Sequence, residues 1–276
     1  MIDQKELQGL KGTAAALRRL VVETVYRAQS GHIGGSLSSA EILTALYFRE
    51  MRLDPANPRM EERDRFVLSK GHITPAYYGA LAMRGFFPIE DLQGFRTLAS
   101  YLQGHPDRNK VAGVDMSSGS LGQGISAAVG IALAGKLKSA AWRTYTLLGD
   151  GEIQEGQVWE ALMFAAQQKL DNLCVIIDNN GLQADGSIDD IASPNPIDEK
   201  LKAFGFSVCV VDGHDLEALL EAFEKARNTR GMPTAILAKT VKGKGVSFME
   251  NQAAWHGKAP NAEQFESAMR ELEVAK

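Results

Sequence analysis

The chain has 276 residues, of which 45% are hydrophobic and 23% are charged, enough for a substantial core in one large or two small domains. The net charge is −4. The longest basic cluster, KTVKGKG at 239–245, is short and interrupted by glycines, so the composition argues against a nucleic-acid partner. No run of about 18 apolar residues occurs, so we expect no membrane span.

The N-terminal segment, MIDQKELQGLKGTAAALRRL, carries charges where a signal peptide would need an apolar run. The chain has two cysteines, Cys174 and Cys209, and each lies inside an apolar run. We therefore expect two buried free thiols and a protein of the reducing cytoplasm.

Helical and strand-like patterns alternate along the chain. Apolar residues at helical spacing predict a helix over 4–29. In SSAEILTALYF, the pair Ser38 and Glu41 has the spacing of a capping box, which predicts the start of an amphipathic helix. We predict strands at 65–69, 144–148, 173–178, 206–211 and 234–240. We predict further helices near 121–138, 154–169, 197–204, 215–228 and 261–276, the last capped by Asn261.

Two of the strand runs, CVIID and TAILA, are apolar throughout rather than alternating. This pattern favours an α/β fold with a doubly wound, mostly parallel sheet covered by helices on both faces. No linker or repeat divides the chain, so we expect residues 1–276 to form a single domain. The connection 179–196 is long for such a fold and is expected to be functional or mobile.

An acidic, glycine-rich loop, LLGDGEIQEG at 147–156, joins a predicted strand to a predicted helix. Asp150 in this loop and the pair Asn179–Asn180 both lie just beyond strand ends, where doubly wound sheets bind ligands. Carboxylate and amide oxygens suit Mg²⁺ or Ca²⁺, and Gly149 and Gly151 would let a diphosphate approach the backbone. The GDG sequence alone is equally typical of a tight turn with an Asp helix cap. The asparagine pair favours the metal site.

Four of the five histidines, His32, His72, His105 and His256, lie in glycine-flanked loops. Zinc-site spacing is absent, because no HxxxH or HxH occurs and no cysteine is adjacent. Hydrogen bonding to hydroxyls and phosphates, with proton transfer near neutral pH, is the better use of such side chains. We interpret the fifth, His214, as structural.

The span from GDGEIQEG to DNN resembles the thiamine diphosphate motif, in which GDG is followed by NN; here Asn180 lies 30 positions after Asp150 (180 − 150). Several further stretches resemble the N-terminal half of transketolase, in the same order, and together they cover nearly the whole chain. They are SGHIGGSLSSAEILTALYF, DRFVLSKGHITPAYYGAL, GHPD, SGSLGQGISAAVGIALA, KTVKGKGVSFMEN and WHGKAP. One departure is GHIGGS, where many transketolases have GHPGAP.

The resemblance implies a thiamine diphosphate-binding fold and a set of site residues. Asp150, Asn180 and the carbonyl of Leu182 would bind the Mg²⁺ (or Ca²⁺) that holds the cofactor diphosphate. The remaining matches are His32, His105 and His256 around the donor sugar and the reacting carbon; His72 and His256 near the diphosphate; Gly119, Ser120 and Leu121 beneath the cofactor ring; and Glu155 and Glu160, which would link paired active sites.

The reaction implied is transfer of a two-carbon ketol unit from a ketose phosphate to an aldose phosphate. A full transketolase also needs a second α/β domain, whose glutamate activates the cofactor and whose basic residues bind the sugar phosphate. Nothing before Lys276 resembles that domain. We therefore expect a split enzyme whose separate C-terminal subunit completes the site. We also expect two copies of each subunit in the assembly, with an exposed apolar patch on the isolated chain.

Three alternatives remain open. The chain could belong to a related thiamine enzyme, such as a deoxyxylulose-phosphate synthase or a ketoacid dehydrogenase, although the four histidine loops favour transketolase. It could be a split transketolase for a branched or sulfonated sugar. It could also be a non-catalytic subunit that only binds a partner, against which the intact pair Asp150 and Asn180 argues.

Overall fold

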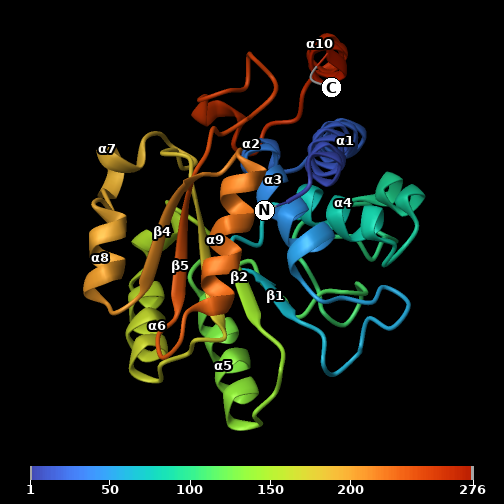
Figure 1. Ribbon diagram of the computed structural model, residues 1–276. Coiled ribbons are helices and arrows are strands. Elements are labelled where there is room, and N and C mark those ends of the chain that lie inside the picture. Colours follow the sequence, from blue (N-terminus) through green and yellow to red (C-terminus); the bar gives the residue numbers. More distant parts are fainter. Residues whose placement is uncertain (1, 275–276) are drawn as a thin grey trace.

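The computed structural model describes residues 2–274, and the residues at either end lie outside this range. A five-stranded sheet with the order β1-β2-β3-β5-β4 forms its centre, and every neighbouring pair is parallel (Figure 1). The strands are β1 (Arg65–Leu68), β2 (Thr144–Gly149), β3 (Leu173–Asn179), β4 (Ser207–Asp212) and β5 (Thr234–Lys239). All five predicted strands are confirmed, and so is their parallel arrangement.

Helices connect the strands and extend both ends of the chain. The α-helices are α1 (Gln4–Ala28), α2 (Ile33–Ser38), α3 (Ala40–Ala45), α4 (Thr74–Arg84), α5 (Gln123–Leu137), α6 (Gly156–Gln167), α7 (Ile188–Ala192), α8 (Ile197–Ala203), α9 (Leu216–Asn228) and α10 (Ala262–Val274). Shorter turns are the π-helical η1 (Leu46–Glu50) and the 3₁₀ turns η2 (Ile89–Gly94), η3 (Glu152–Gln154) and η4 (Ala253–Trp255). None of the helices within residues 2–274 is long and apolar enough to cross a membrane.

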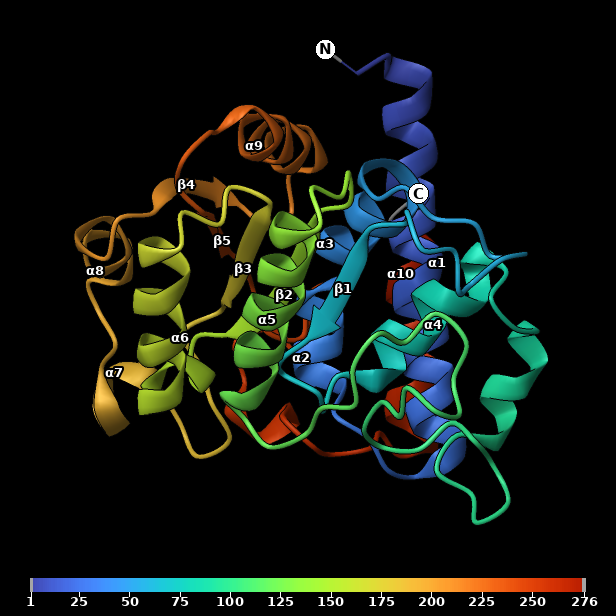
Figure 2. The ribbon, with the colours of Figure 1, turned by 90° about the horizontal axis from the view of Figure 1, so that it is seen from below.

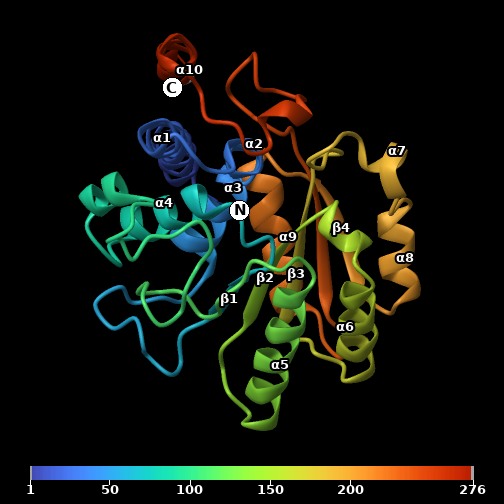
Figure 3. The same cartoon turned by 180° about the vertical axis from the view of Figure 1, so that it is seen from behind.

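The sheet is buried on both faces. Along β3, Cys174 and Ile176 belong to one apolar cluster with α1, α3, α4 and α9, whereas Val175 and Ile177 belong to a second with α5, α6 and α8. Figures 2 and 3 show α9 on one side of the sheet and α5 and α6 on the other. Since both sides of each strand meet helices, the runs are apolar throughout, as predicted. Cys174 and Cys209 are both buried and free.

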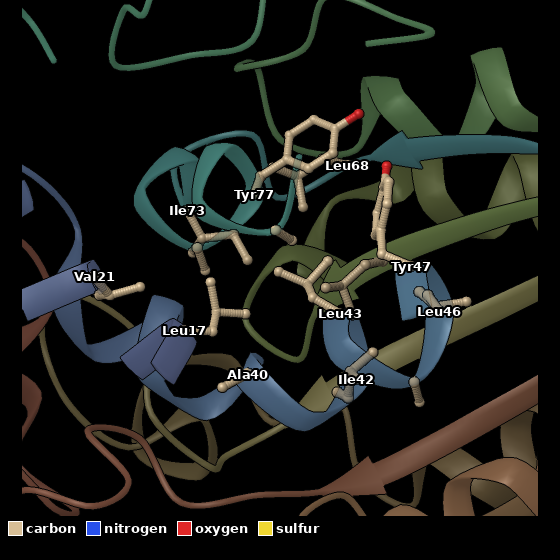
Figure 4. Packing of buried hydrophobic residues seen from close by; sticks show 14 of the residues in the cluster. Leu17, Val21, Ala40, Ile42, Leu43, Leu46, Tyr47, Leu68, Ile73 and Tyr77 are labelled. Carbon is tan, nitrogen blue, oxygen red and sulfur yellow. The ribbon is translucent and has the colours of Figure 1, made fainter. Parts of the chain in front are cut away.

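The larger cluster holds the N-terminal helices against the sheet (Figure 4). Leu17 of α1, Leu43 of α3 and Tyr77 of α4 are at most 1% exposed. Burial of each such side chain contributes about 1.5–3 kcal/mol. At the C-terminal end of α1, Tyr26 stacks on Phe265 of α10 with ring centroids 4.1 Å apart, so these two helices pack together.

The C-terminal helix begins as predicted. The Asn261 side chain accepts a hydrogen bond from the Gln264 backbone N–H at 2.9 Å, and the Gln264 side chain accepts one from Asn261 at 3.0 Å. The two side chains thus cap the helix reciprocally. The helix ends at Val274 within the described range, and the last two residues of the predicted span 261–276 lie outside it.

The capping box predicted from Ser38 and Glu41 is wrong. Ser38 lies inside α2 and its hydroxyl donates to the Asp178 carboxylate at 2.6 Å, while Glu41 binds Arg18 and His214. Because α2 and α3 are separated by Ser39 alone, little of a free helix start remains to be capped. The buried charges of Asp178 and Arg18 take these side chains as partners instead.

Two glycines of α5 give a matched test of this packing. A Cβ at Gly124 would lie 2.5 Å from the Cα of Ser69, whereas a Cβ at Gly130 would meet nothing within 4 Å. We predict that Gly124→Ala lowers the free energy of unfolding by about 1–3 kcal/mol through overpacking. Gly130→Ala should raise it by about 0.5–1 kcal/mol through helix propensity. Urea unfolding of both variants measures this, and changes of the same sign would contradict the packing of α5 on β1.

Candidate active site

A cavity of about 430 Å³ opens at the carboxyl ends of the strands. It is lined by segments that follow β1, β2, β3 and β5, and by loops that carry His32, His105 and His256. In the pairing of β2 with β3, Gly149 lies opposite Asp178, so the GDG loop and the asparagine pair are neighbours. The structure therefore brings together the two loops that the sequence placed at strand ends.

Asp150 lies at the base of this cavity and is 2% exposed. Its carboxylate accepts hydrogen bonds from Gly181 N–H at 2.5 Å, Asn179 Nδ2 at 3.1 Å and Gly151 N–H at 2.8 Å. Burial, followed by the nearby charge of Asp178, raises the pKa of Asp150 to about 6. Within residues 2–274 it forms no ion pair with a basic side chain, so a cation here would compensate a buried negative charge.

Asn180 and Leu182 line the same cavity. Asn180 Nδ2 donates to Asp178 at 3.1 Å and its Oδ1 accepts from Leu182 N–H at 3.1 Å, which fixes the amide orientation. No group of three or more His, Cys, Asp or Glu among the described residues could hold a metal ion. Asp150, Asn180 and Leu182 offer an oxygen set of one carboxylate, one amide oxygen and one carbonyl, which could hold a hard cation together with phosphate oxygens and water.

The glycines of the cavity leave room that a side chain would fill, and several polar atoms of its wall have no hydrogen-bond partner; both features fit a polar ligand. A Cβ at Gly151 would lie 3.0 Å from Gln183, and one at Gly119 would lie 3.0 Å from His105. The buried atoms His32 Nδ1, Gln154 Nε2 and Gln183 Oε1 have no hydrogen-bond partner within the described range. These three residues also line the cavity, so their polar atoms are available to a polar ligand there.

Two buried lysines in the wall were missed at the sequence level. Lys70, 2% exposed, pairs with Asp178 and donates to Ser39 Oγ at 2.8 Å. Lys242, 1% exposed, donates to the carbonyls of Leu182 at 3.2 Å and Gln183 at 3.1 Å. Burial lowers the pKa of Lys242 to about 8. Their place in the sequence could have identified them, because each lysine precedes a glycine just beyond the end of a strand, where ligands bind in such sheets.

Three of the predicted histidines form a cluster. The ring centroids of His32 lie 4.9 Å from His72 and 5.3 Å from His256, and those of His72 and His256 are 5.1 Å apart. Burial lowers the pKa of His32 to about 4 and that of His256 to about 3, and it holds the pKa of His72 well below its usual range. All three are therefore neutral imidazoles at pH 7, able both to donate and to accept.

His105 lines the same cavity but is more exposed, with its pKa lowered by burial and by Arg96. His214 lies outside the cavity, with Nδ1 2.9 Å from Glu41 and Nε2 accepting from Val241 N–H at 2.8 Å. These contacts join α3, the start of α9 and the end of β5, which agrees with the structural role predicted for it.

Of the other residues predicted for the site, some line the cavity and some do not. Gly119, Leu121, Gly149 and Glu155 line the cavity, whereas Ser120 is exposed and Glu160 lies on the outer face of α6. The connection 179–196 is not structureless, because it contains α7 and supplies Leu182 to the cavity wall.

Glu152, which was not predicted, organises the GDG loop. It is 3% exposed and accepts from Ser69 Oγ at 2.6 Å, Gly122 N–H at 3.0 Å and Gly149 N–H at 3.1 Å. This one carboxylate therefore holds three cavity segments together.

Residues 10–275 match the family described as transketolase, thiamine diphosphate binding domain. The chain belongs to this family. It is 46% identical over 264 residues to the 6-deoxy-6-sulfo-D-fructose transketolase subunit SqwG of Clostridium sp. (strain MSTE9), a match that covers 96% of each chain. It is 42% identical to one subunit of the apulose-4-phosphate transketolase of Phocaeicola vulgatus, in a match that covers 98% of this chain and 94% of that subunit.

A solved transketolase has the same fold. The Campylobacter jejuni enzyme superposes with a TM-score of 0.91 and 35% identity over 96% of this chain and 43% of that one. This transketolase homologue therefore spans somewhat less than half the length of the enzyme in that structure. The thiamine diphosphate-binding fold expected from the sequence is confirmed.

The ion pair beneath the cavity gives a second prediction. Lys70→Met removes the cation that pairs with Asp178, which is 0% exposed. An unpaired buried carboxylate should lower the free energy of unfolding by about 3–5 kcal/mol. Lys11→Met, at an exposed position in α1, is the control and should change stability by less than about 0.5 kcal/mol. Denaturant unfolding without cofactor compares them, and equal effects would show that the pair is not needed.

Proposed function

We propose that this chain is the diphosphate- and metal-binding subunit of a two-subunit transketolase. Asp150, Asn180 and Leu182 line one cavity at the strand ends together with two buried lysines, and this observation carries the proposal. The matches to SqwG and to the apulose-4-phosphate transketolase subunit, which extend over nearly the full length of both, support this role.

Thiamine diphosphate is the cofactor that this cavity would hold. Asp150, Asn180 and the carbonyl of Leu182 would bind Mg²⁺ (or Ca²⁺), and Lys70 and Lys242 would offset the charge of the diphosphate. His72 and His256 would donate to its oxygens, and Gly119 and Leu121 would lie beneath the ring. When bound, thiamine diphosphate supplies the nucleophilic carbon needed to break a carbon–carbon bond beside a carbonyl.

The histidines of the chain would bind and orient the sugar. His32 is neutral, so its imidazole can accept a proton from one hydroxyl and donate a hydrogen bond to another oxygen. His256 Nδ1 accepts from Lys242 Nζ at 2.9 Å, which leaves its Nε2 to donate. The orphaned Nδ1 of His32 gives this role an atom that is free to act. His105, the most exposed of the four, would meet the substrate at the entrance and move protons there.

A separate C-terminal subunit would complete the site with an activating glutamate and a sugar-phosphate site, in a 2+2 heterotetramer. Glu155 and Glu160 are both exposed, as a role between paired subunits requires. Beside Glu160 on α6, the apolar side chains of Met163 and Phe164 are 56% and 45% exposed, and they support an interface on this helix. The buried free thiols support the cytoplasm as its compartment.

A second candidate differs in the sugar. The relatives named above act, by their names, on a sulfonated sugar and on apulose 4-phosphate. A specialised split transketolase of that kind uses the same cofactor cavity, and the difference would lie where the tail of the sugar binds.

The test is ketol transfer with thiamine diphosphate and Mg²⁺, using this chain alone and mixed with the product of the neighbouring reading frame. We expect transfer from xylulose 5-phosphate to ribose 5-phosphate in the mixture only. Activity of the chain alone would contradict the two-subunit proposal. Activity of the mixture only with 6-deoxy-6-sulfofructose or apulose 4-phosphate would establish the second candidate.

Cofactor binding tests the metal ligands separately from turnover. Asp150→Ala removes the one carboxylate of the oxygen set, so we predict that metal-dependent binding of thiamine diphosphate is weakened by about a hundredfold or more. Isothermal titration calorimetry in the presence of the partner subunit measures this. Asp185→Ala, at an exposed position in the same connection, is the control. Wild-type cofactor affinity in Asp150→Ala would show that the metal assignment is wrong.

A further inference from the structure

A second cavity, of about 600 Å³, lies between the segment that precedes β1 and the segment that precedes α5. In Figure 1 these segments, residues 51–64 and 105–117, lie together below α4. The charged side chains that line it are Arg59, Arg63, Arg65, Arg108, Lys110 and Asp115. We refer to this group as the basic cleft. It shares no lining residue with the cofactor cavity.

The floor of the basic cleft holds two guanidinium groups and one carboxylate. Arg63 binds Asp115 through two hydrogen bonds, at 2.6 and 3.0 Å, and Arg65 Nε lies 3.7 Å from the same carboxylate. The side chains of Arg63 and Asp115 are 8% and 7% exposed. The lining of the floor sets one carboxylate against two guanidinium groups and is positive. Asp64 and Glu61, which do not line the cleft, offset part of the charge of Arg65.

The rim adds more positive charge. Arg59 and Arg108 are exposed, and neither forms an ion pair with any carboxylate that the structure describes. Lys110 approaches Asp107 at 3.8 Å, and the nearby Glu61 is turned to Lys138 at 3.6 Å. Like charges gathered in one concave site destabilise the chain unless an anion occupies it.

We infer that the basic cleft is a binding site for a small ligand that carries more than one phosphate group, outside the cofactor cavity. Planar guanidinium groups match phosphate oxygens in pairs, and Arg59 and Arg108 have their donors free for this. The charge is gathered in one hollow and not along a stripe, and the chain as a whole is acidic, which favours a compact anion over a nucleic acid.

The basic cleft is connected to the cofactor cavity through segment 105–121. Arg108 N–H donates to Ser117 Oγ at 3.0 Å, and Ser118 Oγ donates to the carbonyl of Leu68 at 2.5 Å. The residues at the two ends of the segment, His105 and Leu121, line the cofactor cavity. A ligand that holds Arg108 would thus restrain a segment that forms part of the cofactor cavity wall.

The test uses the full chain, inorganic pyrophosphate as the probe and isothermal titration calorimetry in EDTA. Metal is excluded because the buried carboxylates of Asp150 and Glu152 oppose a diphosphate in the cofactor cavity without it. Wild-type protein should bind pyrophosphate, and Arg59→Gln/Arg108→Gln should weaken binding by about tenfold or more. Arg63 and Arg65 are left intact because they hold the loop to Asp115.

The matched control removes the same charge elsewhere. Lys11→Gln/Lys225→Gln changes two exposed lysines of α1 and α9, and it should alter pyrophosphate affinity by less than about twofold. Equal weakening in both variants would show only the general attraction of an anion to positive charge, and no binding to the wild type would also overturn the proposal. An oligonucleotide that binds more tightly than pyrophosphate, with the same dependence on Arg59 and Arg108, would assign the cleft to nucleic acid instead.

Hydrogen exchange reports on the connection to segment 105–121. Pyrophosphate should slow amide exchange in peptides from residues 106–117 of the wild type and leave the Arg59→Gln/Arg108→Gln variant unchanged. Equal protection in both proteins would place the ligand outside the basic cleft. Weaker association with the partner subunit in this variant, without any pyrophosphate binding to the wild type, would make the cleft a protein contact and overturn the proposal.

Discussion

The ion pair between Lys70 and Asp178 connects more of this molecule than any other contact of the site. Asp178 is fully buried near the carboxyl end of β3, and it also accepts from Ser38 of α2 at 2.6 Å and from Asn180 at 3.1 Å. Thr240, just beyond β5, donates to its other oxygen. One carboxylate thus connects β1, β3, β5 and the N-terminal helices. A buried carboxylate is costly when it is unpaired, so donors from all of these segments bond to it.

The cavity above this pair is arranged for a ligand and not for the stability of the chain alone. Asp150 keeps a buried carboxylate without an ion-pair partner in the described range, and three polar atoms in the walls have no hydrogen-bond partner there. Lys242 adds a buried positive charge without an ion-pair partner in the described range, whereas that of Lys70 is paired with Asp178. These features cost free energy unless a ligand compensates them. They agree with membership in the thiamine diphosphate-binding family of transketolase domains.

The histidines show how burial decides chemistry. A histidine in water titrates near pH 6.5, yet burial, followed by nearby cations and histidines, lowers the pKa of His32 to about 4 and that of His256 to about 3. A neutral imidazole can accept a proton on one nitrogen while it donates from the other. A cluster of neutral histidines therefore suits hydrogen bonding to hydroxyls and to phosphate oxygens, while the buried lysines carry the positive charge of the cavity wall.

The fold class, the five strands and the loops that carry Asp150, Asn180 and the histidines could be predicted from the amino-acid sequence. They follow from local signals, because apolar runs and glycine-flanked polar residues do not depend on distant parts of the chain. The packing of the folded chain was needed to show that Lys70 and Lys242 enter the site, that Ser38 and Glu41 bind buried charges and do not cap a helix, and that Ser120 and Glu160 face outward. Each of these depends on which side chains meet after folding, since a buried charge selects its partners from segments more than a hundred residues apart, as Lys70 and Asp178 do (178 − 70 = 108).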